Sequence, residues 1–278
     1  MPQLITGKPI RLSPRIQRLL APNPGVMPGT GTNTYFVGED RFAVIDPGPI
    51  IDEHIQTILA TLGDRIQWIL ITHTHPDHSP AAEAIRSETG APILAYEPPP
   101  EHARSRLVPD RALVHGERLK GDGYALRVIH TPGHASNHLC FFLEEERILF
   151  TGDQIMNGST VVIAPPDGDM TAYLDSLEHL KTYPIAQLAP GHGDTMADPV
   201  GVIDGLIQHR LNRESKVIRA LKATGPATVE DLVPPVYDDV PAFLHPIAKY
   251  SLLAHLLKLE LESRARQSKA IWRWVAAK

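Results

Sequence analysis

Histidine and aspartate residues occur in this sequence in local patterns that suit a metal centre. The densest pattern is THTHPDH at residues 72–78, which follows an apolar run and precedes a helical one. Neutral imidazole and carboxylate are the ligands that borderline cations such as Zn²⁺ prefer. Three imidazoles so close together are hard to accommodate without a cation, so this loop predicts metal ligands. They are His73, His75, Asp77 and His78.

Three further ligands are predicted elsewhere in the chain, because four residues cannot fill two coordination spheres. His134, Asp153 and His192 each follow a glycine that comes shortly after a predicted strand. Glycine lets the backbone turn sharply there and present the next side chain. Ligands that come from strand ends at one sheet edge form a rigid site. We therefore expect all seven residues to converge on a pair of cations.

The composition is that of an ordinary globular chain. Its 278 residues are 42% hydrophobic and 21% charged, which suits one large domain with a small one. No run approaches the roughly 18 apolar residues of a membrane span, and residues 1–20 lack the apolar core of a secretory signal. The single cysteine, Cys140, excludes an internal disulfide and is expected to pack in a strand. We expect a cytoplasmic protein without a membrane partner, and its oligomeric state stays open.

Strand-like and helix-like segments alternate through the first 200 residues. The predicted strands are residues 35–37, 42–45, 66–72, 93–96, 125–130, 138–143, 147–150 and 186–189. Helical spacing predicts helices at residues 52–62, 79–89 and 170–182. Two groups of strands separated by helices indicate packed sheets with helices outside. Two segments, residues 97–123 and 158–170, are expected to be irregular and to shape the pocket.

The pattern changes after residue 200. A long helix is predicted to residue 223, a capping box at Thr228 and Asp231 begins a second helix, and a third covers residues 246–263. A strand at residues 270–275 would complete the outline of a winged helix. We therefore expect two domains, a catalytic one over residues 1–200 and a winged-helix-like one over residues 201–278. The second domain has twelve basic and eight acidic residues, although the whole chain has a net charge of -5.

The metal motifs together resemble those of the metallo-β-lactamase superfamily. The shared motifs are VIDPG at residues 44–48, HxHxDH at 73–78, TPGH at 131–134, GD at 152–153 and PGHG at 190–193. The resemblance covers about residues 30–195 and implies an α/β fold, an αββα sandwich. It implies this ligand arrangement: His73, His75 and His134 for a first metal, Asp77, His78 and His192 for a second, and Asp153 as a bridge. It also implies that a buried Asp46 steadies the histidine loop, whereas the residues alone also allow a simple turn residue.

A metal pair of this kind predicts a hydrolase. Two divalent ions, expected to be zinc with iron or manganese as alternatives, would activate a water between them because coordination lowers its pKa toward ~7. Asp77 is the predicted catalytic residue, since it can bind a metal and orient that water. True β-lactamases of the superfamily generally lack the bridging aspartate. The resemblance therefore favours a small ester, thioester or lactone as substrate over weak β-lactam hydrolysis.

Cleavage of single-stranded RNA is the alternative. Residues 23–35 and 250–260 resemble the β-lactamase-like protein 2 group, whose animal member is a mitochondrial endoribonuclease. The basic tail could then help to hold phosphates, but an aromatic content of 6% offers few platforms for stacked bases. A DNA-binding tail is a further alternative, which the leucine-rich third helix disfavours. The tail could also form only a pocket wall or a dimer surface.

Overall fold

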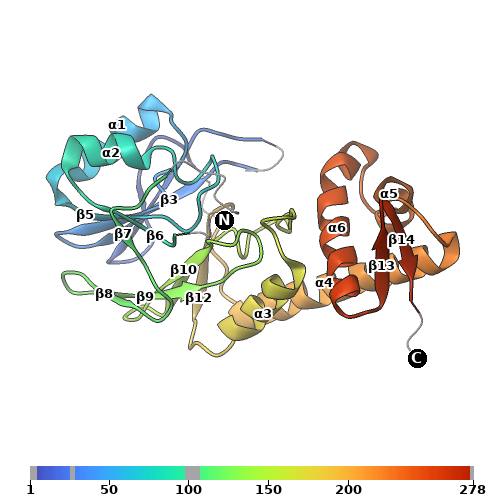
Figure 1. Cartoon of the computed structure of the whole chain (residues 1–278). Coiled ribbons are helices and arrows are strands. Elements are labelled where there is room, and N and C mark those ends of the chain that lie inside the picture. Colours follow the sequence, from blue (N-terminus) through green and yellow to red (C-terminus); the bar gives the residue numbers. More distant parts are fainter. Residues whose placement is uncertain (1–4, 26–28, 98–106, 276–278) are drawn as a thin grey trace.

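The computed structural model describes residues 5–25, 29–97 and 107–275. Two β-sheets pack face to face with helices on their outer faces, and a smaller, mainly helical unit follows (Figure 1). The predicted α/β class, an αββα sandwich followed by a winged-helix-like unit, is confirmed. Two predicted features lie partly outside the described residues. They are the motif at residues 23–35, of which residues 26–28 are not described, and segment 97–123, of which residues 98–106 are not described.

The first sheet has seven strands in the order β1-β2-β3-β4-β5-β6-β7. They are β1 Ile10–Arg11, β2 Ile16–Leu20, β3 Asn33–Gly38, β4 Phe42–Ile45, β5 Ile66–Leu70, β6 Ile93–Ala95 and β7 Arg111–Ala112. Strands β1 to β4 pair antiparallel, and β4 to β7 pair parallel. Parallel neighbours need a crossover, and helices α1 (Asp52–Leu62) and α2 (Ala82–Thr89) supply two of them.

The second sheet has five strands in the order β12-β11-β10-β9-β8. They are β8 Arg118–Lys120, β9 Ala125–His130, β10 Leu139–Leu143, β11 Ile148–Gly152 and β12 Gln187–Pro190. Helix α3 (Met170–Leu180) crosses from β11 to its parallel neighbour β12. The ends of β5, β9, β11 and β12 thus carry the loops in which the sequence predicted metal ligands.

Strand β10 shows how the layers are held together. All its residues are buried, because successive side chains of a strand point to opposite faces and both faces are covered here. Leu139, Phe141 and Leu143 pack between the two sheets. Cys140 and Phe142 pack on the other side, in the cluster that includes α3. The prediction that Cys140 is a packed strand residue is confirmed.

The C-terminal unit has its own core. Its elements are α4 Pro199–Thr224, α5 Val229–Val236, a short 3₁₀ helix Ala242–Leu244, α6 His245–Leu261, and the hairpin β13 Ala265–Ser268 with β14 Ile271–Trp274. The predicted capping box between Thr228 and Asp231 begins α5. Trp272 is fully buried in the core of this unit. No helix among the described residues is long and apolar enough to cross a lipid bilayer.

Helix α4 connects the two cores. Ile203 in its first half packs in the cluster that includes α3, whereas Val217 and Leu221 in its second half pack with Trp272. One helix therefore serves both units. The predicted division between residues 200 and 201 stays a prediction.

The structure adds strands that the sequence did not indicate. Strand β2 was missed because its apolar pattern is broken by Arg18, which is buried and pairs with Asp194 at 2.7 Å. The segment predicted to be irregular, residues 97–123, contains β7 and β8 in its described part. These strands have two and three residues, which is too short for a periodic pattern.

Burial of His54 in α1 should make the protein sensitive to acid. Nε2 of His54 lies 2.9 Å from Oγ1 of Thr34, and burial lowers the pKa of His54 from 6.5 to about 4. As the pH falls below 6.5 the unfolded chain takes up a proton at this residue and the folded chain does not. The free energy of unfolding should therefore fall by about 2 kcal/mol between pH 7 and pH 5 through His54 alone.

Urea unfolding of wild type and His54→Gln at the two pH values measures this contribution. The variant should lose about 2 kcal/mol less than wild type does on acidification. His179→Gln, at an exposed position of α3, should behave like wild type. An equal loss in wild type and His54→Gln would contradict the prediction.

Candidate metal centre

The seven predicted ligands lie together at one edge of the sandwich. They come from the loops that follow β5, β9, β11 and β12, and they form three overlapping trios. The ligand atoms within each trio lie within 4.8 Å of one another. The trios are His73, His75 and His134; His73, His78 and Asp153; and Asp77, His78 and His192. The structure therefore brings every predicted ligand to one place.

Hydrogen bonds on the outside of the cluster decide which ring nitrogen faces inward. Nδ1 of His134 lies 2.8 Å from the carbonyl oxygen of Val162, and Nδ1 of His192 lies 3.0 Å from that of Gly31. A carbonyl oxygen can only accept, so each Nδ1 carries the proton and donates. Each Nε2 then faces into the cluster, where it can bind either a proton or a metal, as in metal-ligating histidines.

Asp46 fixes the orientation of two more histidines. Its Oδ1 accepts from the backbone nitrogen of Thr72 at 2.8 Å, and its Oδ2 accepts from Oγ1 of Thr72 at 2.7 Å and from Nδ1 of His78 at 2.8 Å. Oγ1 of Thr72 can then accept from Nδ1 of His73, 3.0 Å away. Asp46 has a φ of 51°, a conformation that is uncommon outside glycine and persists where surrounding bonds hold it. Asp46 is thus more than a turn residue.

Ring nitrogens meet at close range on one side of the cluster. Nδ1 of His75 lies 3.0 Å from Nε2 of His73 and 2.9 Å from Nε2 of His134. Around a tetrahedral cation with metal–nitrogen distances of 2.0–2.1 Å, neighbouring ligand atoms are about 3.3 Å apart. Burial lowers the pKa of His75 to about 4 and that of His73 well below 6.5, so both are neutral. The donor set therefore fits a cation at this position.

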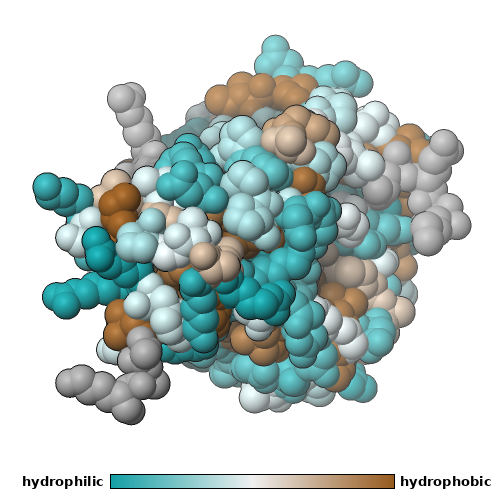
Figure 2. Space-filling model, turned by 90° about the vertical axis from the view of Figure 1, so that its right-hand side faces the viewer, coloured by the Kyte–Doolittle hydropathy of each residue, from teal (hydrophilic) through white to brown (hydrophobic). Residues whose placement is uncertain are grey.

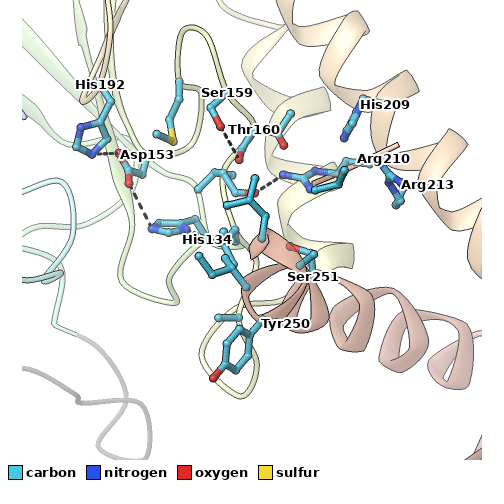
Figure 3. A pocket seen from close by; sticks show the side chains of 18 of the residues that line it. His134, Asp153, Ser159, Thr160, His192, His209, Arg210, Arg213, Tyr250 and Ser251 are labelled. Carbon is cyan, nitrogen blue, oxygen red and sulfur yellow. Dashed lines mark hydrogen bonds and ion pairs between the residues drawn. The ribbon is translucent and has the colours of Figure 1, made fainter. Parts of the chain in front are cut away.

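The other side of the cluster gathers carboxylates. Oδ1 of Asp153 lies 3.3 Å from Nε2 of His192, and its Oδ2 lies 3.7 Å from Nε2 of His134 (Figure 3). Oδ1 also lies 3.4 Å from Nε2 of His78. Oδ1 is buried without a hydrogen bond in the part of the chain described. Oδ2 of Asp77 lies 3.2 Å from Nε2 of His192. A buried carboxylate oxygen without a hydrogen bond is costly unless a cation compensates it.

The pKa of His192 reflects this negative charge. Burial acts to lower its pKa, but Asp153 and Asp77 together raise it to about 9. The pKa of Asp153 is held well below 3.8 against the effect of burial, because His78 and His192 lie beside it. Either a proton or a metal cation must therefore balance the carboxylates here.

His138 also helps to position the cluster, although it is not one of the predicted ligands. It is fully buried, with Nδ1 at 2.9 Å from Oγ1 of Thr131. Its Nε2 accepts from the backbone nitrogen of Asp153 at 3.1 Å, so it helps to place that carboxylate. Between them, Gly152 has a φ of 46°, and a Cβ there would lie 2.7 Å from Nε2 of His138. Only glycine fits at this turn.

A cavity of about 790 Å³ opens from the ligand cluster toward the C-terminal unit. Its walls come from the loop after β11, including part of the predicted segment 158–170, and from α4 and α6. No described residue of segment 97–123 lines it. The expectation that this segment shapes the pocket is wrong for its described part, because β7 and β8 hold it at the ends of the two sheets.

The fold and this donor set define a metal-dependent hydrolase, and the comparisons with known proteins identify its family. Residues 27–192 match the metallo-beta-lactamase superfamily, and residues 228–274 match the beta-lactamase associated winged helix domain. The chain belongs to the metallo-beta-lactamase superfamily.

Within the superfamily, the chain is similar over most of its length to two named groups of proteins. It is 33% identical to the Beta-lactamase-like protein 2 homolog of Drosophila melanogaster, over 94% of this chain and 92% of that protein. It is 34% identical to the homolog of Caenorhabditis elegans, over 87% and 83%. It is also 36% identical to an atrochrysone carboxyl ACP thioesterase of Aspergillus chevalieri, over 83% and 76%.

Solved structures share the fold. A metallo-beta-lactamase family protein from Thermus thermophilus has a TM-score of 0.80 and 24% identity, over 95% of this chain and 100% of that one. A beta-lactamase domain protein from Burkholderia ambifaria has a TM-score of 0.83 and 19% identity, over 98% and 94%. A third protein, solved in a di-iron-bound form, has a TM-score of 0.52 and 27% identity, over 63% and 92%.

Replacing Asp46 should weaken metal binding without changing any predicted ligand. In Asp46→Asn one carboxylate oxygen becomes an amide NH₂, which cannot accept a hydrogen bond, so a contact with Thr72 or His78 is lost. Loss of such an orienting partner typically costs 10–100-fold in metal affinity. Competition against a coloured chelator, with elemental analysis, measures the change. Asp40→Asn, in an exposed turn, is the control, and wild-type affinity in Asp46→Asn would contradict the role given to Asp46.

Proposed function

We propose that the chain binds two divalent metal ions and hydrolyses a small acyl substrate between them. The proposed ligands are His73, His75 and His134 for one ion, Asp77, His78 and His192 for the other, and Asp153 for both. The observation that carries the proposal is the convergence of ring nitrogens of His73 and His134 to within 2.9–3.0 Å of Nδ1 of His75, beside a carboxylate oxygen of Asp153 that lacks a hydrogen bond.

Zinc is the proposed metal, because imidazoles and carboxylates are ligands that suit it. Iron and manganese remain alternatives, since the same ligands accept them. The similarity to a protein solved in a di-iron-bound form supports two ions and keeps iron in consideration. Bound at these ligands, such ions would supply Lewis acidity and a nucleophilic water at neutral pH.

The protein's own groups would orient that water and the substrate. Asp77 lines the cavity, and its side chain is 27% exposed, in contrast to the buried imidazoles around it. Although burial opposes ionisation, His78 and His192 lower the pKa of Asp77 to about 2. Asp77 is therefore ionised at neutral pH and can accept a hydrogen bond from a water molecule, holding its oxygen toward an acyl carbon. We propose it as the catalytic residue.

A thioester is the substrate class we favour, with an ester or lactone next. The similarity to proteins named as acyl-carrier-protein thioesterases over more than four fifths of this chain supports it. So does the cavity, since about 790 Å³ lies within the 300–1,000 Å³ typical of pockets for small molecules. Weak β-lactam hydrolysis is a lesser alternative.

Cleavage of single-stranded RNA is the second candidate. It is supported by three exposed cations on the hairpin of the C-terminal unit: Arg266, Lys269 and Arg273. Two other cations of this unit are neutralised internally, since Arg213 pairs with Asp239 at 2.7 Å and Lys258 with Glu214 at 2.8 Å. On the face shown in Figure 2, hydrophilic residues surround small, separate hydrophobic groups. The internal pairing leaves less positive charge for phosphate contacts, which favours a small substrate over RNA.

The metal-loaded protein should hydrolyse an acyl N-acetylcysteamine thioester, and chelation should abolish turnover. Asp77→Ala should lose about 10²–10⁴-fold in kcat, the range for a group that handles the attacking water. His73→Ala should lose metal as well as activity. His179→Ala, at an exposed position of α3, is the control.

Release of the free thiol, followed with a thiol reagent, measures the rates. Parallel reactions with a lactone, a chromogenic cephalosporin and single-stranded RNA rank the substrate classes. Undiminished thioester turnover by Asp77→Ala after chelation would contradict the mechanism.

The RNA candidate makes a separate prediction about the hairpin. Each phosphate contact that a cation makes contributes to affinity in a salt-dependent way, so reversing three charges should weaken RNA cleavage strongly. The triple variant Arg266→Glu, Lys269→Glu and Arg273→Glu should keep wild-type thioester turnover, because none of the three lines the cavity. Equal RNA cleavage by the triple variant and wild type would exclude the hairpin as an RNA-binding element.

A further inference from the structure

The two ends of the cavity differ in chemical character. His134, Asp153 and His192 lie at one end, and side chains of α4 lie at the other (Figure 3). Between the ends, the lining side chains of the loop after β11 and of α6 are mostly apolar. The residues of α4 at the far end are His209, Arg210 and Arg213. We call these three residues the basic end.

Arg210 carries a buried charge without a carboxylate partner. Its side chain is nearly inaccessible, with the residue 3% exposed, and its guanidinium lies over the ring of Tyr173 at 5.1 Å. Nη2 donates to the carbonyl oxygen of Val161 at 2.5 Å, which fixes the orientation of the group. Nε is buried without a hydrogen bond, and no described Asp or Glu forms an ion pair with it. Such a charge is costly unless an anion joins it.

The neighbours of Arg210 do not supply that anion. Asp239 is already engaged by Arg213 through contacts of 2.7 and 3.2 Å. His209 lines the cavity and offers an imidazole N–H, and Ser251 lines it with a hydroxyl that already accepts from the backbone of Ile163 at 3.2 Å. Glu214, one turn further along α4, is engaged by Lys258 at 2.8 Å. These neighbours are donors or committed acceptors, so an anion that pairs with Arg210 would enter through the cavity.

We propose that the basic end binds an acidic group of the substrate, a carboxylate or a phosphate. This inference rests on the proposed hydrolysis and specifies its substrate class: acyl thioesters or esters that carry a negative charge remote from the reacting bond. In the reaction, water adds to the acyl carbon, the carbon–sulfur bond breaks, and the thiol leaves with a proton. The acidic group takes no part in these steps and only holds the substrate.

A guanidinium suits this task because its planar fork matches two oxygens of a carboxylate or phosphate. The apolar middle of the cavity suits the carbon chain that would separate the acidic group from the acyl carbon. The protein should discriminate strongly against substrates without the acidic group, since a site built for a polar group rejects an analogue that lacks it.

The test compares kcat/KM for three thioesters of equal acyl length. One is a neutral acyl group on N-acetylcysteamine, the second carries a terminal carboxylate on the same acyl group, and the third has the neutral acyl group on phosphopantetheine. Metal-loaded wild type should prefer one charged thioester by about 10- to 100-fold, mainly through KM, because hydrogen bonds between charged groups are strong. A preference for the second identifies a carboxylate, and a preference for the third identifies a phosphate.

Variants assign the preference to Arg210. Arg210→Gln should reduce it to a few-fold at most, and Arg210→Lys, which keeps the charge and fills similar space, should retain part of it. Arg219→Gln is the matched control, since Arg219 is an exposed residue of the same helix. If Arg210→Gln does not fold, as judged by circular dichroism, the Lys variant and His209→Gln carry the comparison.

The possible outcomes separate this inference from the proposed function. Turnover of all three thioesters at similar rates, or a preference that Arg210→Gln leaves unchanged, overturns the basic end as an anion site and leaves the hydrolase standing. No turnover of any thioester overturns the proposed substrate. In that case calorimetric binding of glutarate against butyrate, in wild type and Arg210→Gln, decides the inference: tighter glutarate binding only in wild type supports it, and equal binding overturns it.

Discussion

The short contacts between buried imidazole nitrogens are the constraint on which the rest of this structure depends. Three ring nitrogens converge there at about 3 Å, and either a proton on one of them or a cation between them holds them at that distance. Outer hydrogen bonds prevent the rings of His134 and His192 from turning away. The loops that carry the rings are in turn fixed by the ends of the paired strands. The rigid sandwich thus sustains an arrangement that the side chains would not adopt by themselves.

The ligand cluster could be predicted from the sequence because its information is local. Four ligands share one loop, and His134, Asp153 and His192 each follow a glycine at the end of a strand. Strands such as β10 were equally predictable, since burial on both faces leaves a continuous apolar run. Both cases need only the spacing of residue types along the chain.

Other features could not be predicted because they depend on contacts between distant segments. Arg18 interrupts the pattern of β2, and only the pairing with Asp194 explains why an arginine is buried there. The resemblance implied a supporting role for Asp46, but the residues alone also allowed a simple turn. Its contacts with Thr72 and His78 decide between the two interpretations. Arg210 belongs to a charged helix in sequence. Its place at the end of the cavity depends on how α4 crosses the loop after β11.

The C-terminal unit acts on the ligand cluster through that same loop. The carbonyl of Val162 orients His134, and the two residues beside it are held by the C-terminal unit. Arg210 donates to the carbonyl of Val161, and Ser251 accepts from the backbone nitrogen of Ile163. This unit is therefore a wall of the cavity and a support for one predicted ligand. Deleting the C-terminal unit would therefore impair hydrolysis of any substrate, and such a truncation cannot reveal whether the tail binds RNA. Charge reversal confined to the exposed hairpin can reveal it, because the hairpin does not line the cavity.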